Sequence, residues 1–176
     1  YNINVILNQL SNHFNIVENI EITLEVNPGE TKKEDLFVFK DIGINRLSIG
    51  FQSLDPVLLK TLSRTHNPDD CFKTFENARV AKFDNISIDM MYNVPGQSLS
   101  RWIDDLEILI KLNSDHIAIF PLTSEKGTTF YNEVQSGTIQ FIDSHIEEEM
   151  FTQGSQYVTE NGFTQYEVAH FTKPGM

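Results

Sequence analysis

The sequence predicts an α/β fold in which parallel strands, joined by helices, form part of a (β/α) barrel. Four short apolar segments have the character of strands, and they cover residues 21–26, 46–52, 86–92 and 116–122. Longer segments with helical periodicity and helix caps lie between them. Strands that alternate with helices pair in parallel, because right-handed crossovers return the chain to the same end of the sheet.

The composition limits the class of protein. The chain has 176 residues, 40% of them hydrophobic and 22% charged, which suits one globular domain. Its formal net charge of -12 opposes nonspecific nucleic-acid binding, because nucleic-acid phosphates attract basic surfaces. No apolar run approaches the roughly 20 residues that cross a bilayer, so we expect no transmembrane segment. The single cysteine, Cys71, cannot form an internal disulfide, and this favours a reducing, cytoplasmic location.

Helical signals lie on both sides of the first predicted strand. Residues 3–14 have helical periodicity, and since a β/α repeat rarely starts with its helix, we expect an earlier strand before Tyr1. After the first strand, Thr31 and Glu34 have the spacing of a capping box. Gly43 follows where the end of a helix favours a left-handed residue.

Caps also mark the next two helices. Asn67 followed by Pro68 combines an N-cap with a proline in the first helical turn. Ser98 or Ser100 is in position to cap the helix that carries Trp102. Both helices are therefore expected to connect neighbouring strands of the sheet.

The last third of the chain begins with a loop rich in glycine and threonine after residue 122. A second capping box, Ser144 with Glu147, predicts a helix that runs to Gly162. One final short strand is expected at residues 166–171.

The predicted strands are polar on one face, which is not typical of parallel strands buried on both sides. If helices cover the apolar faces, Glu25, Gln52 and Asp89 converge near the carboxyl ends of the strands, where barrel enzymes build their sites. The residues expected on this shared face are Thr23, Glu25, Ser48, Gln52, Ser87 and Asp89.

Two simpler interpretations remain open at this point. One is an antiparallel sheet with a single solvated face. The other is that Glu25 and Asp89 only form ion pairs with the nearby Arg46 or Arg64. The helices between the strands argue against the first, and the convergence of three polar positions argues against the second.

Six short motifs resemble, in the same order, those of the oxygen-independent coproporphyrinogen III oxidase-like family of radical S-adenosylmethionine (SAM) proteins. Among them, E-V-N-P-G is similar to the family's E-x-N-P-G, and N-R-L-S-I-G-F-Q-S to its N-R-L-S-x-G-x-Q-S. The six matching segments are residues 25–29, 45–53, 64–66, 89–97, 122–128 and 166–175.

The resemblance implies a binding site for SAM on the polar face of the strands. Members of this family use a 4Fe-4S cluster, held by three cysteines, to cleave SAM into a radical. By resemblance, Glu25, Gln52, Arg64 and Asp89 bind SAM, and the backbone near Thr123 closes on the ligand. Arginine suits the carboxylate of SAM because its guanidinium pairs with carboxylates through two hydrogen bonds.

Two motifs that are typical of the family do not occur in this sequence. The C-x-x-x-C-x-x-C motif and the G-G-G-T-P segment are absent, and both normally precede the region where this chain begins. Residues 1–176 are therefore predicted to be one domain, an incomplete barrel without its first strands, its cluster motif and the C-terminal domain. Cys71 is expected to be a packing residue, and Asn93 replaces a glycine at a position that tolerates positive φ.

The motifs are most similar to the haem-chaperone branch of the family. This branch implies haem or another tetrapyrrole as a ligand, and a haem-accepting protein as a partner. A true oxidase, which decarboxylates propionate side chains, is the first alternative, and a non-catalytic stand-alone β/α binding module is the second. No residue of this sequence is predicted to be catalytic or to ligate a metal, and the five histidines show no metal-binding spacing.

Overall fold

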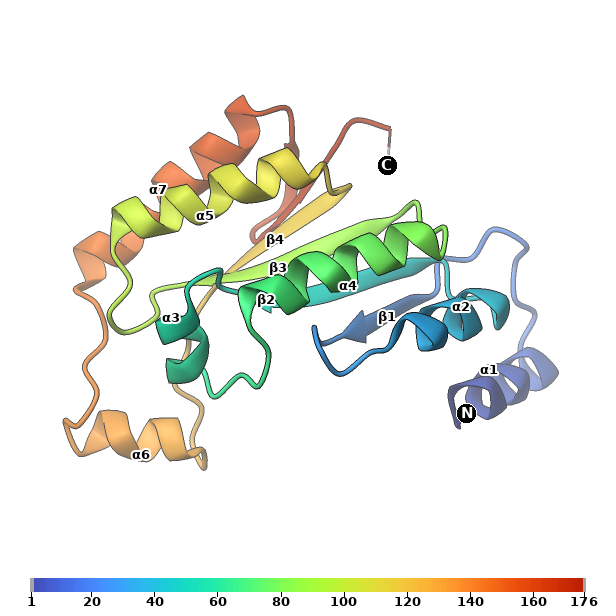
Figure 1. Ribbon diagram of the computed structural model, residues 1–176, viewed down its shortest axis with the longest axis horizontal. Coiled ribbons are helices and arrows are strands. Elements are labelled where there is room, and N and C mark those ends of the chain that lie inside the picture. The colour runs from blue at the N-terminus through green and yellow to red at the C-terminus, as the bar shows by residue number, and fades with distance from the viewer. Residues whose placement is uncertain (1, 176) are drawn as a thin grey trace.

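Six strands form one sheet, in the order β1-β2-β3-β4-β6-β5, in the computed structural model, which describes residues 2–175. Strands β1 to β4 pair in parallel, so the antiparallel interpretation is excluded. Within residues 2–175, β1 and β5 form the two edges of the sheet, and the barrel is therefore partial (Figure 1). The strands are β1 (Thr23–Val26), β2 (Arg46–Gln52), β3 (Ile86–Tyr92), β4 (His116–Pro121), β5 (Thr164–Glu167) and β6 (His170–Thr172).

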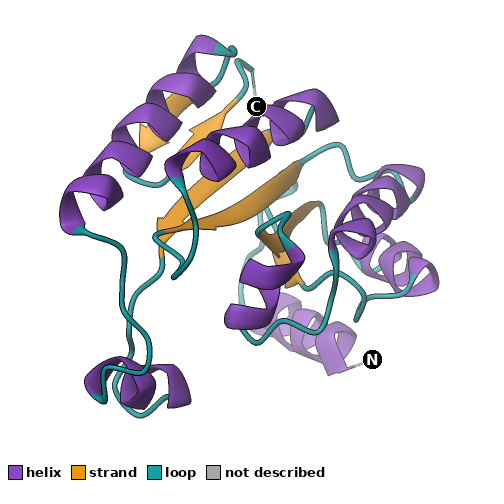
Figure 2. Cartoon of the chain, turned by 60° about the vertical axis from the view of Figure 1, so that its left-hand side comes forward, coloured by secondary structure: helices purple, strands orange, loops and turns teal. Residues whose placement is uncertain are grey.

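Helices connect the parallel strands, as predicted, and lie over one face of the sheet (Figure 2). The helices are α1 (Asn2–His13), α2 (Lys33–Asp41), α3 (Pro56–Thr61), α4 (Pro68–Val80), α5 (Leu99–Leu112), α6 (Thr129–Gln135) and α7 (Ser144–Glu160). Helix α6 stands apart from the sheet, and none of its residues is buried. Among residues 2–175, no helix is long and apolar enough to span a membrane.

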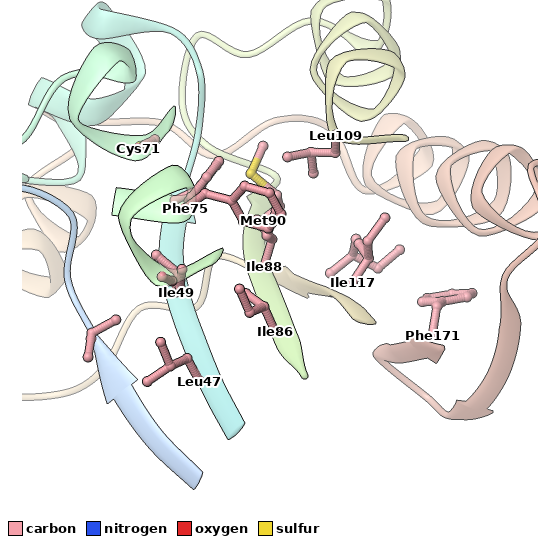
Figure 3. Close-up of a cluster of buried hydrophobic side chains, with 14 of the residues drawn as sticks. Leu47, Ile49, Cys71, Phe75, Ile86, Ile88, Met90, Leu109, Ile117 and Phe171 are labelled. Carbon is pink, nitrogen blue, oxygen red and sulfur yellow. The ribbon is translucent and has the colours of Figure 1, made fainter. Parts of the chain in front are cut away.

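The hydrophobic core fills the space between the sheet and helices α4, α5 and α7 (Figure 3). It receives alternate side chains of the strands, such as Leu47 and Ile49 of β2 and Ile86 and Ile88 of β3, all with 0% exposure. Burying one such side chain contributes about 1.5–3 kcal/mol. We call this covered face of the sheet the outer face, and the opposite face the inner face.

The inner face carries the predicted set of polar side chains. The hydroxyls of Ser48 and Ser87 both donate to Asp89, and Glu25 and Gln52 line a cavity on this face together with Asp89. Thr23 accepts a hydrogen bond from Arg46 of the neighbouring strand. The prediction that the six residues share one face is confirmed.

Helix starts agree with the sequence at two positions and shift by one residue at two others. Asn67 and Ser98 are N-caps whose side chains accept from the backbone N–H groups of Asp70 and Arg101. The first predicted capping box is displaced by one residue, because the backbone N–H of Lys32 donates to the carboxylate of Asp35.

The second displacement is at the start of α7. Asp143, and not Ser144, caps this helix, since its carboxylate accepts from the N–H of His145. A carboxylate is as good an N-cap as a hydroxyl, so the sequence alone does not distinguish a cap at Asp143 from one at Ser144.

The prediction of one strand at residues 166–171 is wrong. Val168 and Ala169 form a turn, and β5 and β6 on either side of it pair as an antiparallel hairpin. Strand β6 also pairs antiparallel with β4, with Phe171 opposite Ile117. The buried Phe171 closes the end of the core, while every residue of β5 is exposed.

We expect the outer face of β3 to determine stability. Ile88→Ala should lower the free energy of unfolding by about 2–5 kcal/mol, because it leaves a cavity in a fully buried core. Val168→Ala, at a turn residue that is 76% exposed, is the control and should change it by less than about 0.5 kcal/mol. Urea unfolding of both variants measures the difference, and equal stabilities would contradict the assignment of the core.

Candidate functional site

A cavity of about 310 Å³ lies on the inner face, toward the carboxyl ends of the first three strands. It brings together four of the five residues predicted to bind a ligand. Its lining consists of Glu25, Val26, Asn27, Ser48, Gly50, Gln52, Arg64 and Asp89. The convergence follows from parallel pairing, which places Glu25 opposite Ser48 and Gly50 opposite Asp89.

Asp89 is fixed in the cavity by hydrogen bonds from two serines. Its carboxylate accepts two contacts from the Ser48 hydroxyl, at 2.7 and 2.9 Å, and one from the Ser87 hydroxyl at 3.2 Å. Burial raises the pKa of Asp89, the hydroxyls of Ser48 and Ser87 oppose that rise, and the Glu25 carboxylate adds to it. Among residues 2–175, no ion pair joins Asp89 to Arg46 or Arg64, so the simple ion-pair interpretation is not supported.

Gln52 enters the cavity through an irregularity at the end of β2. The register with β3 shifts between Gly50 and Gln52, and Gln52 has φ 66°. Its side chain folds back over Gly50. A Cβ atom built on that glycine would be only 2.6 Å from Gln52 Nε2. Glycine at position 50 therefore makes the space in which the Gln52 amide lies.

Arg64 reaches the cavity from the loop after α3. Its backbone N–H donates to the carbonyl of Leu59, and the preceding Ser63 has φ 55°. The guanidinium has one long hydrogen bond, 3.5 Å from Nη1 to Asn27 Oδ1, and remains half-buried. This arrangement leaves most of its donors available to an anionic group.

Helix α3, which carries the chain toward Arg64, was not predicted from the sequence. Asp55 is its N-cap, and the carboxylate accepts from the N–H groups of Val57 and Leu58. Asp55 followed by Pro56 repeats the pattern of cap and proline that marked α4, so a signal was present. The helix is only 6 residues long, and a segment this short shows little periodicity.

Thr123 does not lie with the other four predicted residues. It lines a neighbouring hollow of about 180 Å³ with Leu62, Ser63 and Phe130. Its hydroxyl donates to Glu125 at 3.3 Å. The two hollows are linked through the chain, since Ser63 directly precedes Arg64.

A second cavity, of about 510 Å³, lies at the amino ends of β2, β3 and β4. Sequence reasoning missed it because it needs the β5–β6 hairpin, which supplies Tyr166 and His170. His116 is 8% exposed, and within the described chain neither ring nitrogen has a hydrogen-bond partner. Burial lowers the pKa of His116, and Arg46 lowers it further. The full lining is Glu21, Arg46, Asn85, His116, Tyr166, Glu167, His170 and Thr172.

We expect Asp89→Asn to raise stability at neutral pH. A carboxyl whose pKa is raised by folding contributes stability below its unfolded pKa, and that contribution is lost as the pH rises through the folded value. At pH 7, above the unfolded pKa, the raised pKa of Asp89 therefore costs folding free energy, and Asn removes this cost. The gain should be about 0.5–2 kcal/mol at pH 7 and vanish below about pH 4.

Thermal unfolding from pH 3 to pH 8 measures this difference, with Asp84→Asn at an exposed position as the control. A loss of stability in Asp89→Asn at pH 7 would instead mean that Asp89 has a compensating cation.

Comparisons with known proteins agree with this geometry. The model of the Radical SAM superfamily matches residues 2–109. Radical S-adenosyl methionine domain-containing protein 1, mitochondrial, of Mus musculus is 38% identical over 155 residues, which are 88% of this chain and 35% of that protein. The haem chaperone HemW of Bacillus subtilis is 35% identical over 156 residues, 89% of this chain and 41% of that protein.

A solved structure shows the same fold. Coproporphyrinogen III oxidase (HemN) from Escherichia coli superposes with a TM-score of 0.85 at 22% identity, over 99% of this chain and 40% of that one. The chain thus spans well under half the length of these relatives. Its parallel sheet, its motifs and the matching superfamily model together show that the chain belongs to the radical SAM superfamily.

Proposed function

We propose that the chain forms the SAM-binding part of a radical SAM haem chaperone, in which the inner-face cavity receives SAM. The observation that carries the proposal is the convergence of Glu25, Gln52, Arg64 and Asp89 in one cavity. Two carboxylates, one amide and one guanidinium in this space match the groups that SAM presents. These are ribose hydroxyls, an amino group and a carboxylate.

The chemistry of each side chain supports a particular role. Asp89 and Glu25 offer acceptor oxygens for hydroxyl and amino groups, and charge-assisted hydrogen bonds of this kind are about twice as strong as neutral ones. Arg64 offers its unused donors to the carboxylate of SAM. The Gln52 amide provides both a donor and an acceptor beside Gly50. Thr123 would act only if the loop that follows β4 closes toward the Arg64 loop.

The residues of this chain do not fit the 4Fe-4S cluster that the superfamily implies. A cluster of this type needs three thiolates, and Cys71 is the one cysteine of the sequence. Cys71 has 0% exposure, and burial raises the pKa of its thiol to about 12, so it remains a protonated packing residue. Within residues 2–175, no group of three His, Cys, Asp or Glu side chains is placed to hold a metal ion. We therefore propose that the cluster ligands lie in another part of the protein.

A haem chaperone is favoured over a true oxidase by the sequence relatives. Curated haem chaperones from Bacillus subtilis and Lactococcus lactis are 35% and 33% identical to this chain. The likeness to coproporphyrinogen III oxidase, at 22% identity, supports the fold alone. On this proposal the ligand of the whole protein is haem or a related tetrapyrrole, and a haem-accepting protein is its partner.

We place the protein in a reducing compartment, in agreement with its free thiol. The bacterial relatives favour the cytoplasm, whereas the name of the Mus musculus relative specifies mitochondria. Residues 1–176 would then form one unit of the barrel, with its first strands, its cluster motif and a C-terminal domain elsewhere in the protein.

We expect Arg64→Ala and Asp89→Ala each to weaken SAM binding on the order of tenfold or more. Each removes a charge-assisted hydrogen bond worth about 1.5–3 kcal/mol. Arg64→Lys, which keeps the charge without the planar fork, should lose less than Arg64→Ala. Calorimetric titration of SAM into the full-length, anaerobically purified protein measures the affinities.

Melting curves of the same samples provide the control for folding. Unchanged SAM affinity in well-folded Arg64→Ala and Asp89→Ala would remove the cavity from SAM binding. The chain would then share the sequence and fold of the superfamily without using this cavity for SAM.

A further inference from the structure

A buried carboxylate lies behind the cavity, on a helix that supplies none of its lining. Asp105 of α5 has 0% exposure. Its Oδ2 accepts from the Ser53 hydroxyl at 3.3 Å and from the backbone N–H of Leu54 at 3.1 Å. Both donors come directly after Gln52, the last residue of β2.

Arg101 binds the next peptide group, on the other side of the Leu54 Cα atom. It lies one turn before Asp105 on α5, and its Nη2 donates to the Leu54 carbonyl at 3.1 Å. Its Nε is 3.3 Å from Asp105 Oδ1 and 3.6 Å from Asp55 Oδ2. Helix α5 thus binds both the N–H and the C=O of Leu54, and it contacts the N-cap of α3.

These contacts fall where the backbone needs support. Gln52 has φ 66°, a conformation that is unfavourable for a residue with a Cβ atom, and its regular pairing with β3 is broken by the bulge. Ser53 N–H turns back to the carbonyl of Phe51 at 2.8 Å. Beyond that turn, the next fixed points are the hydrogen bonds from Ser53 and Leu54 to Asp105.

The same cluster also sets the start of α3. Asp55, which Arg101 contacts, caps α3 and donates its own N–H to the Ser53 hydroxyl at 3.0 Å. Helix α3 leads within a few residues to Arg64. The charged cluster around the buried Asp105 is therefore connected to two of the four residues proposed to bind the ligand. It reaches Gln52 through the chain and Arg64 through helix α3.

The charge of Asp105 has an energetic cost. Burial raises the pKa of Asp105, and the Leu54 amide and Arg101 oppose the rise. A neutral acceptor would satisfy the same two donors without a buried charge, but its hydrogen bonds would be weaker and would allow more movement of the peptide. A strongly held turn is what a ligand site needs, because small displacements of contacting groups lower affinity.

We infer that Asp105 is a positioning residue of the SAM site, which fixes the Ser53–Leu54 turn and thereby the directions from which Gln52 and Arg64 enter the cavity. The inference rests on the proposed SAM-binding function. It assigns to α5 a part in ligand binding although no side chain of α5 lines the cavity.

The test compares three substitutions in the full-length, anaerobically purified protein, by calorimetric titration with SAM and by melting curves. Asp105→Ala should raise the dissociation constant for SAM roughly tenfold in protein that is still folded at the titration temperature. Asp105→Asn keeps one acceptor oxygen and should raise it only about threefold. Asp104→Ala, at the exposed neighbouring position on α5, is the matched control and should bind SAM like the parent protein.

Hydrogen exchange provides a readout at the turn itself. The amides of residues 52–54 should exchange faster in Asp105→Ala than in Asp104→Ala, and SAM should slow them less. If Asp105→Ala does not fold, the double variant Asp105→Asn with Ser53→Ala takes its place, and an unchanged affinity for SAM there overturns the inference.

The outcomes separate this inference from the function on which it rests. Lower melting temperature with unchanged SAM affinity in Asp105→Ala, while Asp89→Ala loses SAM, makes Asp105 purely structural and overturns the inference alone. Unchanged SAM affinity in Asp89→Ala rejects the proposed function and the positioning role together.

Discussion

Coverage of only one face of the parallel sheet by helices is the constraint on which the rest of the structure depends (Figure 2). Leu47, Ile49, Ile86 and Ile88 alternate along β2 and β3, and their side chains fill the core under α4 and α5. Because side chains alternate along a strand, every apolar residue that faces the core sends its neighbour to the inner face. The alternation that builds the core therefore also builds the polar cavity. A shift of strand register by one residue would destroy both.

The inner face bears charge that the fold alone does not require. The half-buried carboxylate of Asp89 accepts from two serine hydroxyls, but desolvation and the nearby Glu25 carboxylate outweigh them and raise its pKa. The backbone of Gln52 has a positive φ, and its side chain lies over Gly50. Asp105 accepts a hydrogen bond from the turn that follows Gln52. Residues with unfavourable backbone angles or unfavourably placed charges cluster at ligand sites. There, contacts with the ligand offset the free-energy cost. We therefore expect the same residues to lower the stability of the chain and to raise its affinity for SAM.

The sequence predicted the parts of the structure that repeat a simple period. The bounds of β2 and β3, the caps at Asn67 and Ser98, and the convergence of Glu25, Gln52 and Asp89 all follow from alternation and capping rules. Features that depend on contacts between distant segments were missed. The β5–β6 hairpin has no glycine at its turn, and the cavity around His116 exists only because the hairpin folds back on β4. The role of Asp105 was also invisible, because its partners Ser53 and Leu54 lie about fifty residues away in the chain.

A crystal structure of the full-length protein with SAM bound tests the central claim most directly. The account predicts that SAM lies in the inner-face cavity, with its carboxylate on Arg64 and a hydroxyl or amino group on Asp89. It also predicts that the Leu54 amide keeps its hydrogen bond to Asp105 in the complex. SAM bound elsewhere, with Asp89 paired to Arg64 across an empty inner face, would contradict the account.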